Sequence, residues 1–368
     1  MTAAAAPTPA PAPARASAAA LRARRLPLLA LGFVALAGGV LAGLARLGWV
    51  VPLPHADMAL LHGPLMVSGF FGTVIGLERA SALGHRWVFL GPLASGLGGL
   101  ALVAGLPVPA GAALLVVASA VLTVASWRVW RFQPAGFTAT MAGAAACSLV
   151  GNLLWLLGAP VQAAVVWWML FLVLTIAGER LELSRFRPPN RWAAPGFALI
   201  VAALAGGGVL AVAEPEAGLR LAGVGLVGLA AWLARFDVAR HTVRGTGLPR
   251  YVAACLLSGY AWLAVAGALA AGAGEGFYDA ALHALFLGFV FAMVFGHAPI
   301  ILPAVLRLAV PFGNVLYLPL AALHLGVALR VAGVLSDDLP LRQWGGAANV
   351  AAIALFIVLT ASRVLKRR

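Results

Sequence analysis

Apolar runs of roughly 20 residues recur along the chain from residue 27 almost to its end. A run of this length is what an α-helix needs to cross about 30 Å of hydrocarbon. We expect twelve such spans, at residues 27–48, 56–77, 87–106, 110–127, 136–158, 161–178, 193–213, 218–234, 251–272, 280–303, 312–333 and 345–362. The pattern therefore predicts an all-α, polytopic transmembrane bundle.

Composition supports this class. The 368-residue chain is 63% hydrophobic and 10% charged, whereas soluble domains are nearer 50% apolar and about 25% charged. Residues 1–25 are rich in Ala and Pro and are expected to form a disordered cytoplasmic tail. Residues 26–364 would be one helical domain, and residues 365–368 a basic cytoplasmic C-terminus. The first run is too long for a signal-peptide core and is interpreted as an uncleaved anchor.

The net charge of +14 is a topology signal. With the N-terminus inside, 21 of the 25 basic residues lie on inner segments, and only Arg46, Arg220, Arg330 and Arg342 lie outside. Basic residues stay cytoplasmic, so both termini are expected there. The expected partner is a lipid bilayer rather than nucleic acid. The 24 arginines to one lysine, with much alanine, indicate a GC-rich bacterial genome and hence the bacterial inner membrane.

The second span, "LLHGPLMVSGFFGTVIGLER", carries His62 inside its apolar run. At 100° per residue, Met58 and Met66 lie within about 40° of His62, on a face otherwise made of small residues. Small residues admit a close helix or leave room for a flat cofactor. Pro64 predicts a kink beside the histidine.

Three more histidines lie within spans, His283 and His297 on the tenth and His324 on the eleventh. His62 and His283 should both lie roughly 6–9 Å below the outer surface, at about 1.5 Å per residue. They form a predicted outer tier. His297, about 21 Å deeper on the tenth span, and His324 near mid-membrane form a looser inner tier.

Two imidazoles from different helices at one depth suit axial ligation of a haem. We therefore predict His62 and His283 as cofactor ligands, with Met58 and Met66 as secondary contacts. His297 and His324, with Met293, are candidate metal ligands, because thioethers are soft donors that suit copper. The alternative is that these histidines bond to one another or to backbone carbonyls across the bundle.

Two segments carry a resemblance to a known family. "PHADMALLHGPLMVSGFFGTVIGLER" and "ALHALFLGFVFAMVFGHAPIILPAVL" resemble the histidine-containing helices of NnrS-type proteins, which are twelve-helix bacterial membrane proteins. That family is linked to nitric-oxide stress and is reported to bind haem and copper. The resemblance covers two helices, implies His62 and His283 as ligands, and implies a role in the nitrosative stress response or in redox metal handling.

The layout is also similar to subunit I of the haem–copper oxidases, which has twelve helices in three pseudo-repeated groups of four. Here "TVIGLER" closes the second span, "TIAGER" the sixth, and "FGH" occupies a comparable depth on the tenth. Several ligands of that family are missing, because the sixth span lacks His and Tyr and the tenth lacks His-x-His. We therefore expect no oxygen-reducing binuclear centre.

Acidic residues lie at the predicted inner face. Glu78 and Glu179 are each followed by an arginine, Arg79 and Arg180. These four residues are predicted to form a salt-bridged structural clamp between the second and sixth spans. The alternative is a cytoplasmic entrance for protons or ions.

The residues leave three classes of function open, with or without enzymatic turnover. The first is a haem- or copper-binding membrane protein of the NnrS type. The second is a secondary transporter or metal-ion permease with a path lined by His and Met, for which inverted repeats and broken helices are expected. The third is a non-catalytic membrane assembly factor.

Overall fold

The computed structural model describes residues 18–184, 190–272 and 275–365. Within these ranges the chain forms helices and no strand. Twelve helices are long and apolar enough to cross a membrane. The predicted class is confirmed: the protein is an all-α, multi-pass membrane protein.

Two of the spans are composite. The second joins η1 (Ala56–Leu61), α2 (His62–Pro64), η2 (Leu65–Phe71) and α3 (Gly72–Leu83). The tenth joins α12 (Tyr278–His283), η5 (Ala284–Phe291) and α13 (Ala292–Leu306), after the 3₁₀ turn η4 (Glu275–Phe277).

The remaining spans are regular helices, two of them preceded by a 3₁₀ turn. In chain order they are α1 (Ala18–Arg46), η3 (Arg86–Phe89) with α4 (Leu90–Val103), α5 (Val108–Phe132), α6 (Gly136–Leu156), α7 (Val161–Ser184), α8 (Ala193–Ala213), α9 (Pro215–Phe236), α11 (Gly247–Gly272), η6 (Asn314–Leu316) with α14 (Tyr317–Leu335), and α15 (Leu339–Leu365); the short α10 (Ala239–Thr242) lies in a loop.

The start of the first span differs from the prediction. Helix α1 begins at Ala18, so residues 18–25 are helical rather than part of a disordered tail. The sequence "AAALRARR" consists of strong helix formers, and long arginine side chains can extend toward water beside an apolar helix. Residues 1–17 of the predicted tail and residues 366–368 of the predicted C-terminus lie outside the described residues.

Glycine and proline end several spans. Gly105 and Gly158 follow α4 and α6 with φ angles of 75° and 82°, a left-handed conformation that glycine adopts without strain. Pro107 and Pro160 lie two residues further on, where a residue without an N–H prevents the helix from continuing. The spans therefore end at sharp turns and pack against their chain neighbours.

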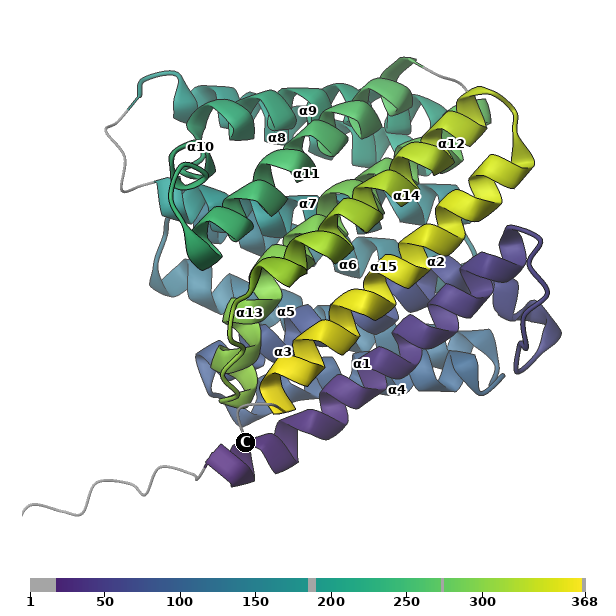
Figure 1. The fold of residues 1–368 in the computed structure, drawn as a ribbon, viewed down its shortest axis with the longest axis horizontal. Coiled ribbons are helices and arrows are strands. Elements are labelled where there is room, and N and C mark those ends of the chain that lie inside the picture. The colour runs from purple at the N-terminus through teal and green to yellow at the C-terminus, as the bar shows by residue number, and fades with distance from the viewer. Residues whose placement is uncertain (1–17, 185–189, 273–274, 366–368) are drawn as a thin grey trace, which may run out of the picture.

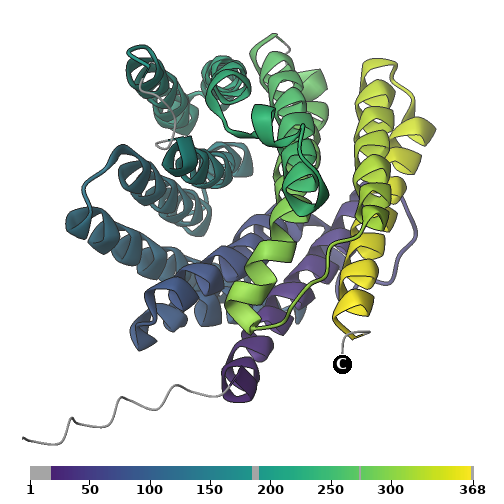
Figure 2. The ribbon, with the colours of Figure 1, turned by 60° about the vertical axis from the view of Figure 1, so that its left-hand side comes forward.

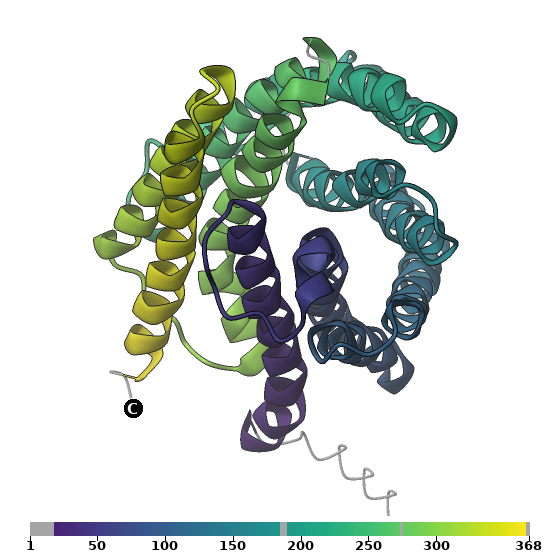
Figure 3. The ribbon, with the colours of Figure 1, turned by 90° about the vertical axis from the view of Figure 1, so that its right-hand side faces the viewer.

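The helices follow a curved path in chain order, from purple through teal and green to yellow (Figures 2 and 3). The last helix, α15, lies alongside the first, α1 (Figure 1). A hydrogen bond fastens the two, because Gln343 Nε2 donates to the Leu47 carbonyl at 2.8 Å. The path is thereby closed.

The tenth span contacts both the second and the sixth span. Helix α3 contacts α13, and α7 contacts η5. Helix α7 is buried along most of its length and supplies much of the core, including Trp168 and Phe171. The spans at the interval of four helices noted in the sequence are thus linked through the tenth span, which packs on the other two.

Helices α8 and α9 give a test of close packing away from these inner spans. A Cβ at Gly207 would lie 2.6 Å from the backbone nitrogen of Ala222. Gly207→Ala should therefore force the two helices apart and cost about 1–3 kcal/mol of unfolding free energy. Thermal unfolding of the purified protein in detergent measures the change.

Gly143→Ala is the matched control, because a Cβ there meets no atom within 4 Å. It should leave stability unchanged or raise it by up to about 1 kcal/mol through helix propensity. Equal melting temperatures for the two variants would contradict the packing argument.

Candidate functional site

His62 begins α2 and lies against α1. Its Nδ1 atom is 2.7 Å from the carbonyl oxygen of Gly39. A Cβ at Gly43 would lie 2.8 Å from the Cε1 atom of the ring, so only glycine lets the imidazole lie this close to α1. The first span thus fixes both the position and the orientation of the ring.

His283 is the last residue of α12 and is held by its own helix. Its Nδ1 atom is 2.8 Å from the Asp279 carbonyl oxygen and 3.2 Å from the Oδ1 atom of the same residue. One carbonyl and one carboxylate oxygen therefore share the Nδ1 proton. The side chain of Asp279 fixes this imidazole as the α1 backbone fixes the other.

The two rings lie next to each other and nearly parallel, with centroids 6.1 Å apart and planes inclined by 19°. The prediction that His62 and His283 lie side by side is confirmed, and their role as ligands stays a prediction. Each Nδ1 must donate, because a carbonyl oxygen only accepts. In the neutral rings both Nε2 atoms then carry a free lone pair, which is the usual state of a metal-binding histidine whose other nitrogen is held.

Each of these histidines precedes a π-helical segment, a feature that the sequence analysis did not predict. Segment η2 starts three residues after His62, and η5 starts directly after His283. π-Helical turns are rare and are frequent at functional sites. Pro64 contributes to the first break, since it has no N–H to donate. The tenth span has no proline at the corresponding place.

Both histidines line a cavity of about 380 Å³. Its walls come mainly from α1, the second span, α7, the tenth span and α15, and they are largely apolar and aromatic. Trp168 in the wall is fixed by a hydrogen bond from its Nε1 to Asn152 Oδ1 at 2.9 Å. Ser68 donates to the same oxygen at 2.6 Å, so Trp168, Asn152 and Ser68 form one hydrogen-bonded group behind this wall.

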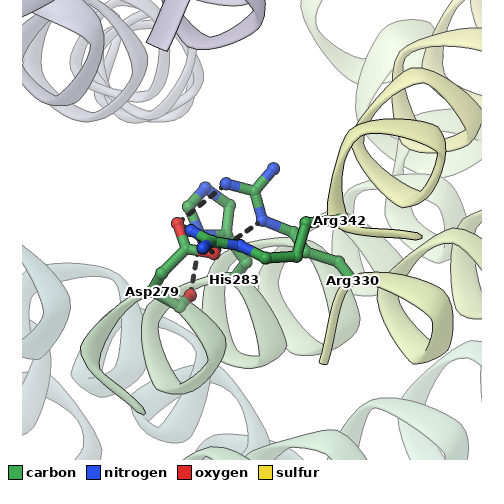
Figure 4. Close-up of polar contacts among 4 residues, drawn as sticks. All are labelled: Asp279, His283, Arg330 and Arg342. Carbon is green, nitrogen blue, oxygen red and sulfur yellow. Dashed lines mark hydrogen bonds and ion pairs between the residues drawn. The ribbon is translucent and has the colours of Figure 1, made fainter. Parts of the chain in front are cut away.

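Charged residues also line the cavity, and none of them was predicted as a site residue. Arg330 forms a two-pronged ion pair with Asp279, at 3.0 and 2.8 Å. Arg342 approaches the same carboxylate at 3.9 Å. Figure 4 shows both guanidinium groups and His283 gathered around this one aspartate. Arg46 also lines the cavity.

The methionines do not converge as predicted. Met66 lines the cavity, but Met58 is fully buried and lies against the position of Gly38 on α1. Met293 is buried against Gly259 of α11. Glycines on neighbouring helices create space that these long, flexible side chains fill. Met58 and Met293 therefore act as core residues.

The predicted inner tier is not formed. His297 donates from Nδ1 to the Met293 carbonyl at 2.7 Å, and its Nε2 lies 3.2 Å from Arg180 Nη2. Because arginine only donates, this bond occupies the Nε2 lone pair. His324 instead bonds Ser258 Oγ at 2.8 Å and leaves a buried Nδ1 without a partner. The two histidines have different partners and do not contact each other.

The clamp differs from the predicted salt bridges. In the described ranges Glu78 and Glu179 form no ion pair within 4 Å. Glu179 nevertheless lies close enough to Glu78, Arg79 and Arg180 to interact with them electrostatically. Arg180 bonds His297, and Arg79 donates to the sulfur of Met141 at 3.3 Å. The arginines thus link the sixth span to the tenth and the second to α6.

Taken together, the fold and the site define a twelve-span helical membrane protein with two adjacent imidazoles in the lining of one cavity. The chain belongs to the family described as a domain of unknown function, DUF8744, whose match covers residues 25–365. No curated protein and no solved structure matches it.

The ion pair beside His283 gives a stability prediction. Asp279→Asn leaves the guanidinium of Arg330, whose side chain is only 8% exposed, without a full countercharge. Breaking a buried pair on one side costs several kcal/mol. Since Asp279 is 28% exposed, we expect a loss of about 2 kcal/mol, measured by thermal unfolding in detergent.

Glu216→Gln is the control, because it breaks an exposed pair with Arg220 whose side chains are 52% and 50% exposed. Exposed pairs of this kind contribute less than about 1 kcal/mol. If Asp279→Asn were as stable as Glu216→Gln, the ion pair between Asp279 and Arg330 would not contribute to the stability of the fold.

Proposed function

We propose that the protein binds a metal-containing cofactor, with haem as the leading candidate, through His62 and His283. The observation that carries the proposal is the state of the two rings. Their centroids are 6.1 Å apart, and each Nδ1 is held by a carbonyl, which leaves both Nε2 lone pairs for a ligand.

The spacing of the rings fits a metal between them. A metal–imidazole bond is about 2 Å long, and about 1 Å more separates each nitrogen from the centre of its ring. Two imidazoles that share one metal therefore have centroids about 6 Å apart. The observed separation of 6.1 Å matches this spacing, although stacked aromatic rings occupy the same range. A hydrogen bond between the two histidines is excluded by their Nδ1 partners, because both Nε2 atoms are then acceptors.

The cavity favours haem over a lone copper ion. Copper sites in proteins recruit further soft donors, but Met58 points to α1 and Met293 to α11. Across residues 18–184, 190–272 and 275–365, no group of three or more His, Cys, Asp or Glu side chains could hold a metal ion. Aromatic walls around two histidines instead suit a large, flat, apolar cofactor.

The proposed setting is the bacterial inner membrane, as the basic inner segments and the arginine-rich composition suggest. The resemblance to NnrS-type proteins adds a role in nitric-oxide stress or redox metal handling. A haem held by two histidines would supply one-electron chemistry. This chain would contribute the two nitrogen ligands, the apolar wall and the exclusion of water.

A secondary transporter is the second candidate, and the two π-helical segments favour it. Irregular helices at matched positions are typical of transporters. Here the second and tenth spans stay continuous but turn π-helical at matched positions beside the cavity. Uptake of copper by proteoliposomes, lost in His62→Ala, without any bound chromophore, would support transport over haem binding.

The direct test is an absorption spectrum with metal and haem analysis of the purified protein. The wild type should show a Soret band and bound haem, and His62→Ala or His283→Ala should lose at least half of it. Loss is expected because each variant removes one of two axial nitrogens.

His297→Ala and His324→Ala are the matched controls, since neither residue lines the cavity. They should retain haem at the level of the wild type. A wild-type protein with neither haem nor copper would overturn the proposal, as would equal haem content in all four variants.

A further inference from the structure

The cavity contains three of the four arginines that break the charge rule of the chain. Arg46, Arg330 and Arg342 lie at the outer end, where basic residues are disfavoured, and all three line the cavity. The fourth, Arg220, lies on α9, away from the cavity, and forms an exposed ion pair with Glu216 of the same helix. The exceptions to the topology signal are therefore concentrated at one site.

The charges of this lining do not balance. Its only charged residues are Arg46, Arg330, Arg342 and Asp279. Three positive charges and one negative charge leave an excess of two positive charges, counting the histidines as neutral. Arg46 is exposed, whereas the Arg342 side chain is only 30% exposed. A positive charge withdrawn from water beside an apolar bundle is costly unless a partner compensates it.

The excess belongs to two particular arginines. Arg330 is satisfied by its two-pronged bond with Asp279. Arg342 reaches that carboxylate only at 3.9 Å, and its Nε is buried without a hydrogen-bond partner. Arg46 forms no hydrogen bond or ion pair with any residue in the described ranges, although it lies close enough to act electrostatically on His62 and Tyr278.

We infer that Arg46 and Arg342 bind two carboxylates of the ligand that occupies this cavity, so that the ligand presents a dianionic pair of carboxylates. The inference rests on the proposed function and narrows it. Haem carries two propionate carboxylates on one edge of its ring and would balance the excess charge. A free copper ion is a cation, which the same three arginines would repel. Guanidinium groups also match carboxylates in geometry.

The phosphate of an outer-leaflet lipid could also supply negative charge to these arginines. Lipid phosphate is not joined to a tetrapyrrole, so a binding experiment with modified haem can distinguish it from the carboxylates of the cofactor. Hemin and hemin dimethyl ester have the same iron and ring, but the ester lacks both charges. Only carboxylates that belong to the cofactor make the protein prefer the free acid.

The experiment titrates cofactor-depleted protein in detergent with hemin and with hemin dimethyl ester, and follows the Soret band. Wild-type protein should bind hemin at least tenfold more tightly than the ester. The double variant Arg46→Gln/Arg342→Gln should bind both compounds about equally. Arg220→Gln, an outer arginine away from the cavity, should keep the wild-type preference.

Each outcome decides. Equal binding of the two compounds by the wild type, with the same spectrum, would overturn the inference while leaving the histidine ligation intact. A preference retained in the double variant would overturn the assignment to Arg46 and Arg342. Binding of copper without hemin would overturn the dianion but leave a metal site, and binding of neither would overturn both proposals. The wild-type comparison stands even if the double variant fails to fold.

Discussion

A buried imidazole needs a partner for each nitrogen, and in this bundle the Nδ1 partners of His62 and His283 are backbone carbonyls. These two bonds set the ring orientations, and they leave the Nε2 lone pairs for a ligand. Glycines on α1 let the first ring lie close to that helix. The geometry of the site thus depends on how near α1 approaches the second span.

The outer and inner halves of the tenth span illustrate how the same residue type takes different roles. His283 lies at the cavity with one nitrogen uncommitted, whereas His297 has both nitrogens engaged, one by Met293 and one by Arg180. Asp279 connects the first of these histidines to Arg330. A carboxylate that holds a histidine and is itself held by arginine is a typical support for a ligand-binding imidazole.

Periodicity and charge were enough to predict the helix count, the approximate bounds and the proximity of His62 and His283. Depth alone failed for His297 and His324, because it gives no information on which side of a neighbouring helix a ring faces. The methionine predictions failed for a similar reason, because Met58 and Met293 fill space beside glycines on other helices. The clamp prediction failed because Arg180 and Arg79 bond His297 and Met141 rather than the two glutamates. The outer arginines were the available signal for the missed part of the site: three of the four exceptions to the charge pattern line the cavity.

The central claim is that two imidazole nitrogens, one from each of two spans, bind one metal. Electron paramagnetic resonance of the oxidised protein, with histidine labelled by ¹⁵N, tests it most directly. Hyperfine couplings from two imidazole nitrogens, reduced to one in His62→Ala, are the predicted result. A wild-type signal with coupling to one imidazole or to none, or the absence of any metal signal, would contradict the account.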